Sequence, residues 1–99
     1  MIEISKREAA GETVLAVSGC LDTASTPKFS EATDAVASGM LVVDMTGLEF
    51  IASSSLRQLV KTKKRLIAVG GDVELSGVND VIGEVMRMTG LDEVFVLRK

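Results

Sequence analysis

Histidine, tryptophan and tyrosine are absent from this 99-residue sequence, and cysteine and proline occur once each. Without histidine the chain can form neither a Ser-His-Asp triad nor a Cys-His pair, and it offers no imidazole ligand to a metal. A single cysteine, Cys20, excludes an internal disulfide and the multi-cysteine type of zinc site. We therefore expect no metal and no cofactor, and the common catalytic groups are missing.

Charge and apolar patterning exclude further classes of protein. The formal net charge of −3 and the lack of Tyr and Trp argue against a nucleic-acid-binding domain. No apolar run approaches the roughly 20 residues that a membrane-spanning helix needs, so we expect no membrane insertion. The first residues carry charge, unlike a signal peptide, and one cysteine fits a reducing compartment. These features predict a single cytoplasmic domain over residues 1–99.

The apolar pattern predicts an α/β domain with the order ββαβαβαβ. Residues 1–5 and 13–18 are expected to form an antiparallel hairpin with a loose loop, followed by a helix from Thr26-Pro27 to Gly39. Further strands are predicted at 41–45, 72–75 and 94–97, and further helices at 53–68 and from the Asn79 cap through Met88. Helical crossovers make the later strands parallel neighbours in a mixed sheet. Residues 48–51 are expected to form a short apolar hook.

The same periodicity predicts which side chains face the core. In order along the three helices these are Phe29, Ala32, Val36, Ala37, Leu56, Leu59, Val60, Ile67, Val81, Ile82, Val85 and Met86. The methionines at 40, 45, 86 and 88 are expected to fill the core as well.

Three consecutive serines, Ser53, Ser54 and Ser55, open the second predicted helix. A serine here can cap the helix, accept a phosphate or act as a nucleophile, although no histidine base is present. Ser55 and Gln58 match a capping box, so capping explains one serine. A phosphate would meet free N–H groups and the positive end of the helix dipole. Local physics favours capping and leaves phosphorylation open.

The segment VVDMTGLEFIASSSL resembles the signature of STAS domains, the bacterial anti-sigma factor antagonists. The match includes Val42, Val43, Asp44, Met45, Leu48, Phe50, Ile51, Ser53, Ser54 and Leu56, and segments 19–22 and 88–95 also resemble the family pattern. This resemblance implies a single STAS-type domain that acts in a partner switch, as a binding module and not as an enzyme. The unphosphorylated protein would bind an anti-sigma factor that is also a serine kinase, and a serine phosphatase would restore binding after phosphorylation.

By motif position, the resemblance implies phosphorylation at Ser54, with Ser53 as the second choice and Ser55 as the third. It also implies that Asp22 lies near the serines on the partner-facing surface, although Asp22 alone could simply order its own turn. Thr23, Ser25 and Thr26 either share that surface or cap the first helix. The predicted partner-binding residues are Asp22, Thr23, Ser53, Ser54, Ser55, Arg57 and Lys61.

The sequence departs from the family pattern at three positions in the serine segment. Ala52 replaces the usual Asp, and Ser55 and Arg57 stand where the family often has Gly. Arg57 and Lys61 recur at helical spacing, which is typical of a solvated face or of a surface for an acidic partner. Ala52 leaves open a constitutive STAS-type adaptor or scaffold, in a lipid-transport or stress-signalling complex, that works without phosphorylation. A small-ligand-binding domain is a third possibility.

Overall fold

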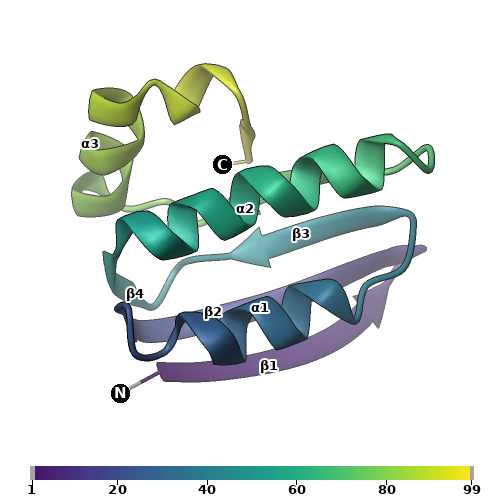
Figure 1. Ribbon diagram of the computed structural model, residues 1–99, viewed down its shortest axis with the longest axis horizontal. Coiled ribbons are helices and arrows are strands. Elements are labelled where there is room, and N and C mark those ends of the chain that lie inside the picture. The colour runs from purple at the N-terminus through teal and green to yellow at the C-terminus, as the bar shows by residue number, and fades with distance from the viewer. Residues whose placement is uncertain (1, 99) are drawn as a thin grey trace.

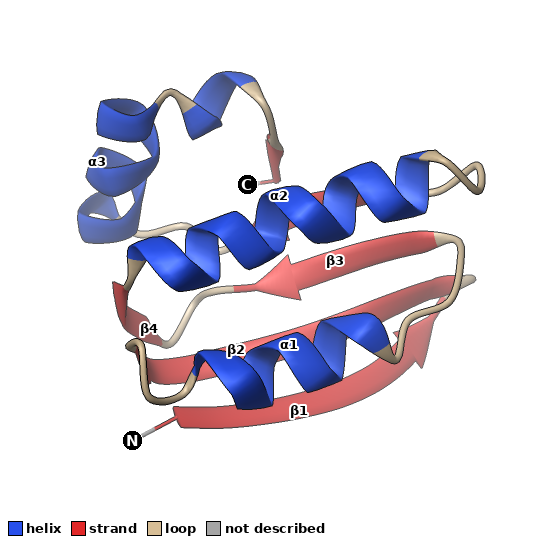
Figure 2. Ribbon diagram, viewed as in Figure 1, coloured by secondary structure: helices blue, strands red, loops and turns tan. Residues whose placement is uncertain are grey.

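The computed structural model describes residues 2–98 and combines one mixed six-stranded sheet with three α-helices (Figure 1). The elements are β1 (Ile2–Ala9), β2 (Glu12–Leu21), α1 (Thr26–Asp34), β3 (Met40–Asp44), β4 (Leu48–Ile51), α2 (Ser53–Ile67), β5 (Asp72–Ser76), α3 (Asp80–Thr89), a 3-10 turn (Leu91–Glu93) and β6 (Val96–Arg98) (Figure 2). The predicted α/β class and mixed sheet are confirmed. The sequence did not predict β4 as a strand.

The sheet has the strand order β1-β2-β3-β5-β6, and β4 pairs with β2 off this path. Within the described residues 2–98, only β1 and β2 pair in antiparallel fashion, as predicted, and every other strand pair is parallel. The parallel connections all advance in the same direction, so right-handed crossovers place their helices on one face. Accordingly α1 and α2 lie side by side in front of the sheet (Figure 1). Among residues 2–98, no helix is long and apolar enough to span a membrane.

The hairpin between β1 and β2 is tighter than predicted. Its strands pair from Ile2 with Gly19 to Ala9 with Glu12, which leaves only Ala10 and Gly11 in the turn. Both turn residues have positive φ, 52° and 78°, as a type I′ turn requires. The polar residues that predicted a loose loop are instead the exposed ends of the two strands. Charge is well tolerated there because β1 is an edge strand with a solvated side.

Strand β4 was missed because its burial does not alternate. Leu48 and Ile51 are buried, whereas Glu49 and Phe50 between them are exposed. The register of β4 against β2 shifts between Gly19 and Cys20, which breaks the period of two that marks a strand in the sequence. The sequence pattern of residues 48–51 is therefore compatible with both the predicted hook and the bulged strand that the structure has.

The core lies between the sheet and the helices. It includes Leu15, Val17, Phe29, Leu41, Val43, Met45, Leu56, Leu59, Leu66, Val73, Leu75, Ile82 and Met86, all almost completely buried. The predictions for Ile67, Val81 and Met88 were wrong, because these side chains are exposed. Each lies within one residue of a helix end, where the apolar stripe no longer meets the sheet. Helix α1 also ends at Asp34, so Ala37 lies beyond it and is exposed.

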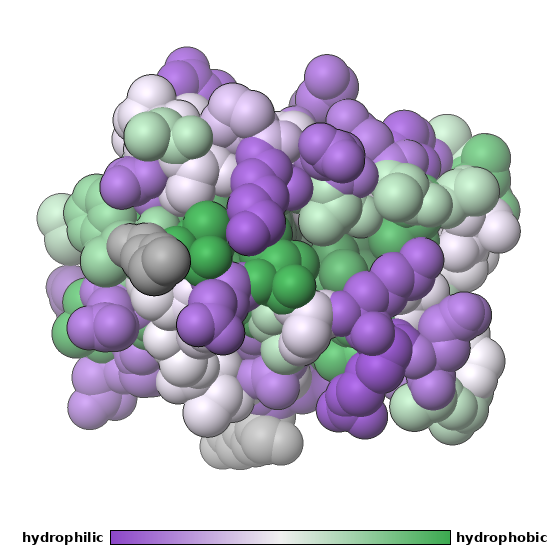
Figure 3. Space-filling model, turned by 90° about the horizontal axis from the view of Figure 1, so that it is seen from below, coloured by the Kyte–Doolittle hydropathy of each residue, from purple (hydrophilic) through white to green (hydrophobic). Residues whose placement is uncertain are grey.

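The edge of the sheet at β1 carries both apolar and charged surface. A groove between β1 and α1 is lined by Ile4, Lys6, Leu15, Lys28, Glu31, Ala32 and Ala35. Seen from below, a hydrophobic band crosses the molecule between hydrophilic side chains (Figure 3). Lys6, Arg7 and Glu8 occupy the half of β1 nearest the turn, and charges of this kind discourage an edge strand from pairing with another chain. At the other edge, Arg98 forms ion pairs with Glu74 and with Glu12.

Replacing Ala10 with Asn should stabilise the protein. Ala10 holds a left-handed conformation that costs an ordinary side chain about 1–2 kcal/mol, whereas Asn adopts it readily at the first position of a type I′ turn. We expect Ala10→Asn to raise the free energy of unfolding by about 0.5–1 kcal/mol in urea denaturation. Ala9→Asn is the matched control, because Ala9 is in a strand and should gain nothing. Equal effects of the two substitutions would contradict the turn assignment.

Candidate functional site

Two loops meet where the parallel strands β2 and β4 end. Strand β2 ends at Leu21 and leads into α1, and β4 ends at Ile51 and leads into α2. Leu21 and Ile51 are paired in register, so the chain leaves the sheet at the same level in both places. The amide of Ala52 also donates to the carbonyl oxygen of Leu21 at 2.7 Å. The pairing therefore places the loop after β2 beside the serines that open α2.

The three serines occupy three different environments. Ser53 is exposed, Ser54 is half-buried and Ser55 is completely buried. The residue at the N-cap position is Ala52, in an extended conformation, and no side chain in the part of the chain that the structure describes caps the helix. The predicted capping box of Ser55 with Gln58 is therefore wrong, because the helix already begins at Ser53. Ser55 has no exposed surface, so a partner can reach only the other two serines.

Gln58 links the two helices instead of capping one. Its buried amide nitrogen donates to Thr33 Oγ1 at 2.9 Å and to Asp34 Oδ1 at 3.1 Å. Two turns further along α2, Arg65 donates to the backbone carbonyls of Val36 at 2.7 Å and of Thr33 at 2.9 Å. Arg65 thus binds the carbonyl of Thr33, in the last turn of α1, and that of Val36, just beyond the helix. Sequence reasoning missed both roles, although an amide beside Leu59 in an inner stripe hinted at a buried polar contact.

Thr26 joins the two loops through its side chain. Its Oγ1 lies 2.8 Å from Ser54 Oγ and 2.8 Å from Ser55 Oγ, and it donates to the carbonyl oxygen of Asp22 at 3.0 Å. The sequence left Thr26 undecided between the partner surface and a helix cap. The structure places it as the first residue of α1, in contact with the serines of α2.

Asp22 orders the turn that precedes α1. Its Oδ1 accepts hydrogen bonds from Ser25 Oγ at 2.8 Å and from the Ser25 amide at 2.9 Å. These two bonds, the side-chain bond first, hold the pKa of Asp22 below its usual range, so the carboxylate is ionised at neutral pH. Asp22 and Thr23 are both exposed. The turn-forming role is thus visible in the geometry, and the role in partner binding stays a prediction.

The predicted basic residues extend the same surface along α2. Arg57 and Lys61 are exposed and follow Ser54 by three and seven residues, so all three lie on one face of the helix. Of the seven residues predicted to bind a partner, only Ser55 is buried and Ser54 is half-buried. The other five are exposed: Asp22, Thr23, Ser53, Arg57 and Lys61. The structure therefore groups six of the seven on accessible surface around the ends of β2 and β4.

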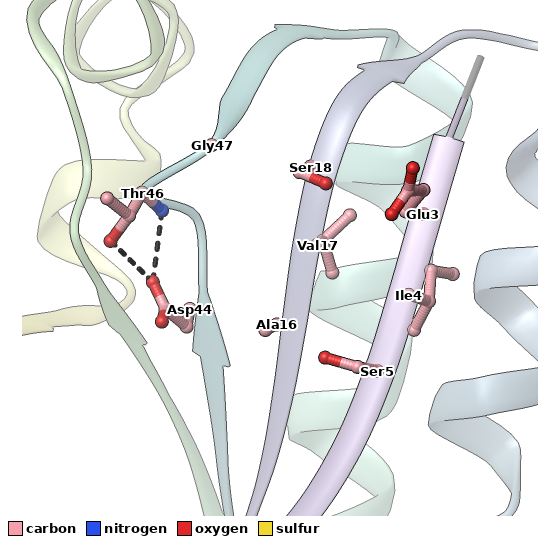
Figure 4. Close-up of a pocket in the computed structure, with 9 residues that line it drawn as sticks. All are labelled: Glu3, Ile4, Ser5, Ala16, Val17, Ser18, Asp44, Thr46 and Gly47. Carbon is pink, nitrogen blue, oxygen red and sulfur yellow. Dashed lines mark hydrogen bonds between the residues drawn. The ribbon is translucent and has the colours of Figure 1, made fainter.

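Asp44, the aspartate of the family signature, shapes a different turn. Its Oδ1 accepts hydrogen bonds from Thr46 Oγ1 at 2.6 Å and from the Thr46 amide at 3.0 Å (Figure 4). These bonds, the hydroxyl's first, hold the pKa of Asp44 below its usual range. Asp44 and Thr46 line a pocket with Glu3, Ser5 and Ser18 that has a volume of about 160 Å³. Ligand pockets usually have roughly 300–1,000 Å³, so this pocket adds nothing to the ligand-binding alternative.

Comparison with known proteins gives relatives over nearly the whole chain. A model of the STAS domain family matches residues 2–99. An anti-sigma factor antagonist from Mycobacterium paratuberculosis is 28% identical with a TM-score of 0.88, covering 98% of this chain and 85% of that chain. An anti-sigma-factor antagonist (STAS) domain protein from Planctomyces limnophilus is 25% identical with a TM-score of 0.84, covering 97% and 88%.

A more distant relative shares the fold alone. The phosphorylated form of the Bacillus cell fate determinant SpoIIAA is 16% identical with a TM-score of 0.73, covering 98% of this chain and 92% of that chain. A search of curated protein sequences gave no match. The family model covers the signature segment, the loop after β2 and the C-terminal segment that carried the resemblance. This chain belongs to the STAS domain family.

Proposed function

We propose that this chain is an anti-sigma factor antagonist of the cytoplasm, which binds an anti-sigma factor that is also a serine kinase. Phosphorylation of Ser54 by that kinase ends the binding, and a serine phosphatase restores it. The chain is then a binding module and a kinase substrate, and its partners supply the chemistry. Two relatives that cover nearly all of it, at 28% and 25% identity, are described as anti-sigma factor antagonists, which supports the proposal.

The observation that carries the proposal is the position of Ser54 in the first turn of α2. The first amides of a helix have no carbonyl partners within it, and α2 has no side-chain cap. A phosphate on Ser54 would meet these amides and the positive end of the helix dipole. Its charge of about −1.5 to −2 is therefore compatible with the folded helix. Phosphorylation would change the surface and leave the fold intact.

Arg57 and Lys61 explain how one phosphate could end binding. In the unmodified protein they present positive charge along the accessible face of α2, one and two turns beyond Ser54. A partner that places acidic groups against this face would meet a dianion after phosphorylation. Contacts between like charges at an interface cost several kcal/mol, which is enough to release a partner of moderate affinity.

A phosphomimetic substitution tests the switch. We expect Ser54→Asp to weaken binding to the cognate anti-sigma kinase about 100-fold, because about 3 kcal/mol is a modest penalty for like charges in contact. Ser54→Asn is the matched control, since it has the size of Asp without the charge and should bind within a few-fold of wild type. Calorimetric titration measures both. Equal affinity of the two variants would make the chain a constitutive adaptor, the alternative that Ala52 suggests.

Phosphorylation itself should be confined to one serine. After incubation with the kinase and ATP, mass spectrometry is expected to find phosphate on Ser54 and none on the buried Ser55. Ser54→Ala should abolish the modification, whereas Ser53→Ala should preserve it. Modification that persists in Ser54→Ala and disappears in Ser53→Ala would move the site to Ser53.

Charge reversal on α2 tests the proposed acidic partner. Arg57→Glu combined with Lys61→Glu should slow association about tenfold at low salt, because electrostatic steering raises association rates. The difference should vanish near 0.5 M salt, where charges are screened over about 4 Å. Lys6→Glu with Arg7→Glu changes the net charge equally on the β1 edge and serves as control. Stopped-flow rates that are alike for both double variants would rule out a steering role for α2.

A further inference from the structure

The hydroxyl of Thr26 has one proton and three oxygen neighbours. The carbonyl oxygen of Asp22 can only accept, so the Thr26 proton is directed to it across 3.0 Å. The two contacts of 2.8 Å to Ser54 Oγ and Ser55 Oγ must then use the lone pairs of Thr26. Both serines therefore donate to Thr26. The hydrogen bonds run in one direction, from Ser54 through Thr26 to the backbone of Asp22.

Phosphorylation of Ser54 is incompatible with this direction. The ester replaces the serine proton with phosphorus, and all the oxygens of the fully ionised group accept hydrogen bonds. Thr26 Oγ1 and the ester oxygen would then be two acceptors in contact unless Thr26 turns its own proton toward the phosphate. The Asp22 carbonyl loses that donor when Thr26 turns. Ser55 can continue to donate to Thr26 in either state.

We propose that Thr26 is a positioning residue that couples the state of Ser54 to the turn formed by residues 22–25. The physiological trigger rests on the proposed function, whereas the hydrogen bonds do not. With a neutral serine, Thr26 holds the Asp22 carbonyl; with an anionic acceptor at position 54, Thr26 donates to that acceptor and releases the carbonyl. One modification thereby changes two adjacent parts of the surface, the serine turn and the loop that displays Asp22 and Thr23.

The Asp22 carbonyl is well placed to transmit this change. It also accepts from the amides of Ser25 at 3.2 Å and Thr26 at 3.1 Å, whereas the single proton of the Ser25 hydroxyl is used by the Asp22 carboxylate at 2.8 Å. The bond from Thr26 Oγ1, at 3.0 Å, is the shortest of the three. Its loss should loosen the turn without unfolding it, because the carboxylate of Asp22 still accepts from Ser25.

Amide exchange with solvent, measured by NMR at Ser25 and Thr26, tests the coupling in the protein alone. We expect Ser54→Asp to speed exchange at these amides about fivefold, the effect of losing one typical hydrogen bond. Ser54→Asn should leave exchange unchanged, because its amide group can still donate to Thr26. The conservative Thr26→Ser background retains a hydroxyl and should show the same fivefold response to Ser54→Asp.

Thr26→Val is the decisive background because it keeps the shape and removes the hydroxyl. In it, Ser54→Asp should change exchange at residue 25 by less than twofold relative to Thr26→Val alone. A fivefold response that persists without the hydroxyl would overturn the proposal, and so would the absence of any response in the wild-type background. If Thr26→Val fails to fold, the double variant Thr26→Val with Ser55→Ala serves as the background instead. Ser55→Ala removes the buried Ser55 hydroxyl, which would have no acceptor once the Thr26 hydroxyl is gone.

The exchange measurement needs neither kinase nor anti-sigma factor, so its outcome is independent of the proposed function. If the kinase leaves Ser54 unmodified but amide exchange responds to the substitutions as expected, the hydrogen-bond coupling through Thr26 exists and the phosphorylation switch does not. If Ser54→Asp blocks partner binding equally in the wild-type and Thr26→Val backgrounds and the turn never responds, the switch works through charge at Ser54 alone.

Discussion

The pairing of β4 with β2 is the constraint on which the rest of the site depends. It brings the ends of two distant segments, at Leu21 and Ile51, to the same level of the sheet. A hydrogen bond from the Ala52 amide to the Leu21 carbonyl then fixes where α2 begins. Because the strands are parallel, both following helices start at this edge and both present their positive ends there. Without this short strand, the start of α2 would lose its backbone link to the end of β2.

Side-chain contacts between α1 and α2 preserve this arrangement along the helices. Thr26 contacts the serines at the start of both helices, and Gln58 reaches the side chains of Thr33 and Asp34 at the end of α1. Further along α2, Arg65 donates to the carbonyls of Thr33 and Val36. These polar contacts are directional, so they add a requirement for orientation to the close packing of the aliphatic side chains beneath them. The helices are thus held in register by hydrogen bonds and held to the sheet by apolar burial.

Local sequence signals predicted the parts of the structure that local physics decides. Helical periodicity identified Leu59 and Ile82 as core residues. Gly90 ends α3 in the left-handed conformation, which glycine adopts without steric cost. The resemblance to the STAS signature predicted that Asp22 lies near Ser54, and Thr26 contacts both residues in the structure. The predicted capping box was wrong because the side chain of Gln58 donates to Thr33 and Asp34 of α1, and these contacts between helices cannot be read from the local sequence. Strand β4 was missed because a register shift removes its alternation, and the different burial of three identical serines depends on the neighbouring helix.

The missing cap of α2 has a consequence for how the helix responds to modification. A favourable cap is worth about 1 kcal/mol, and Ala52 supplies none, so the first turn of α2 is held chiefly by its packing on α1. An anion covalently attached in that turn would supply the electrostatic complement that the sequence omits. The modified protein should then have the less frayed helix. Phosphorylation would then act in opposite directions on adjoining parts of the surface, because it would firm the first turn of α2 while it loosens the turn of residues 22–25.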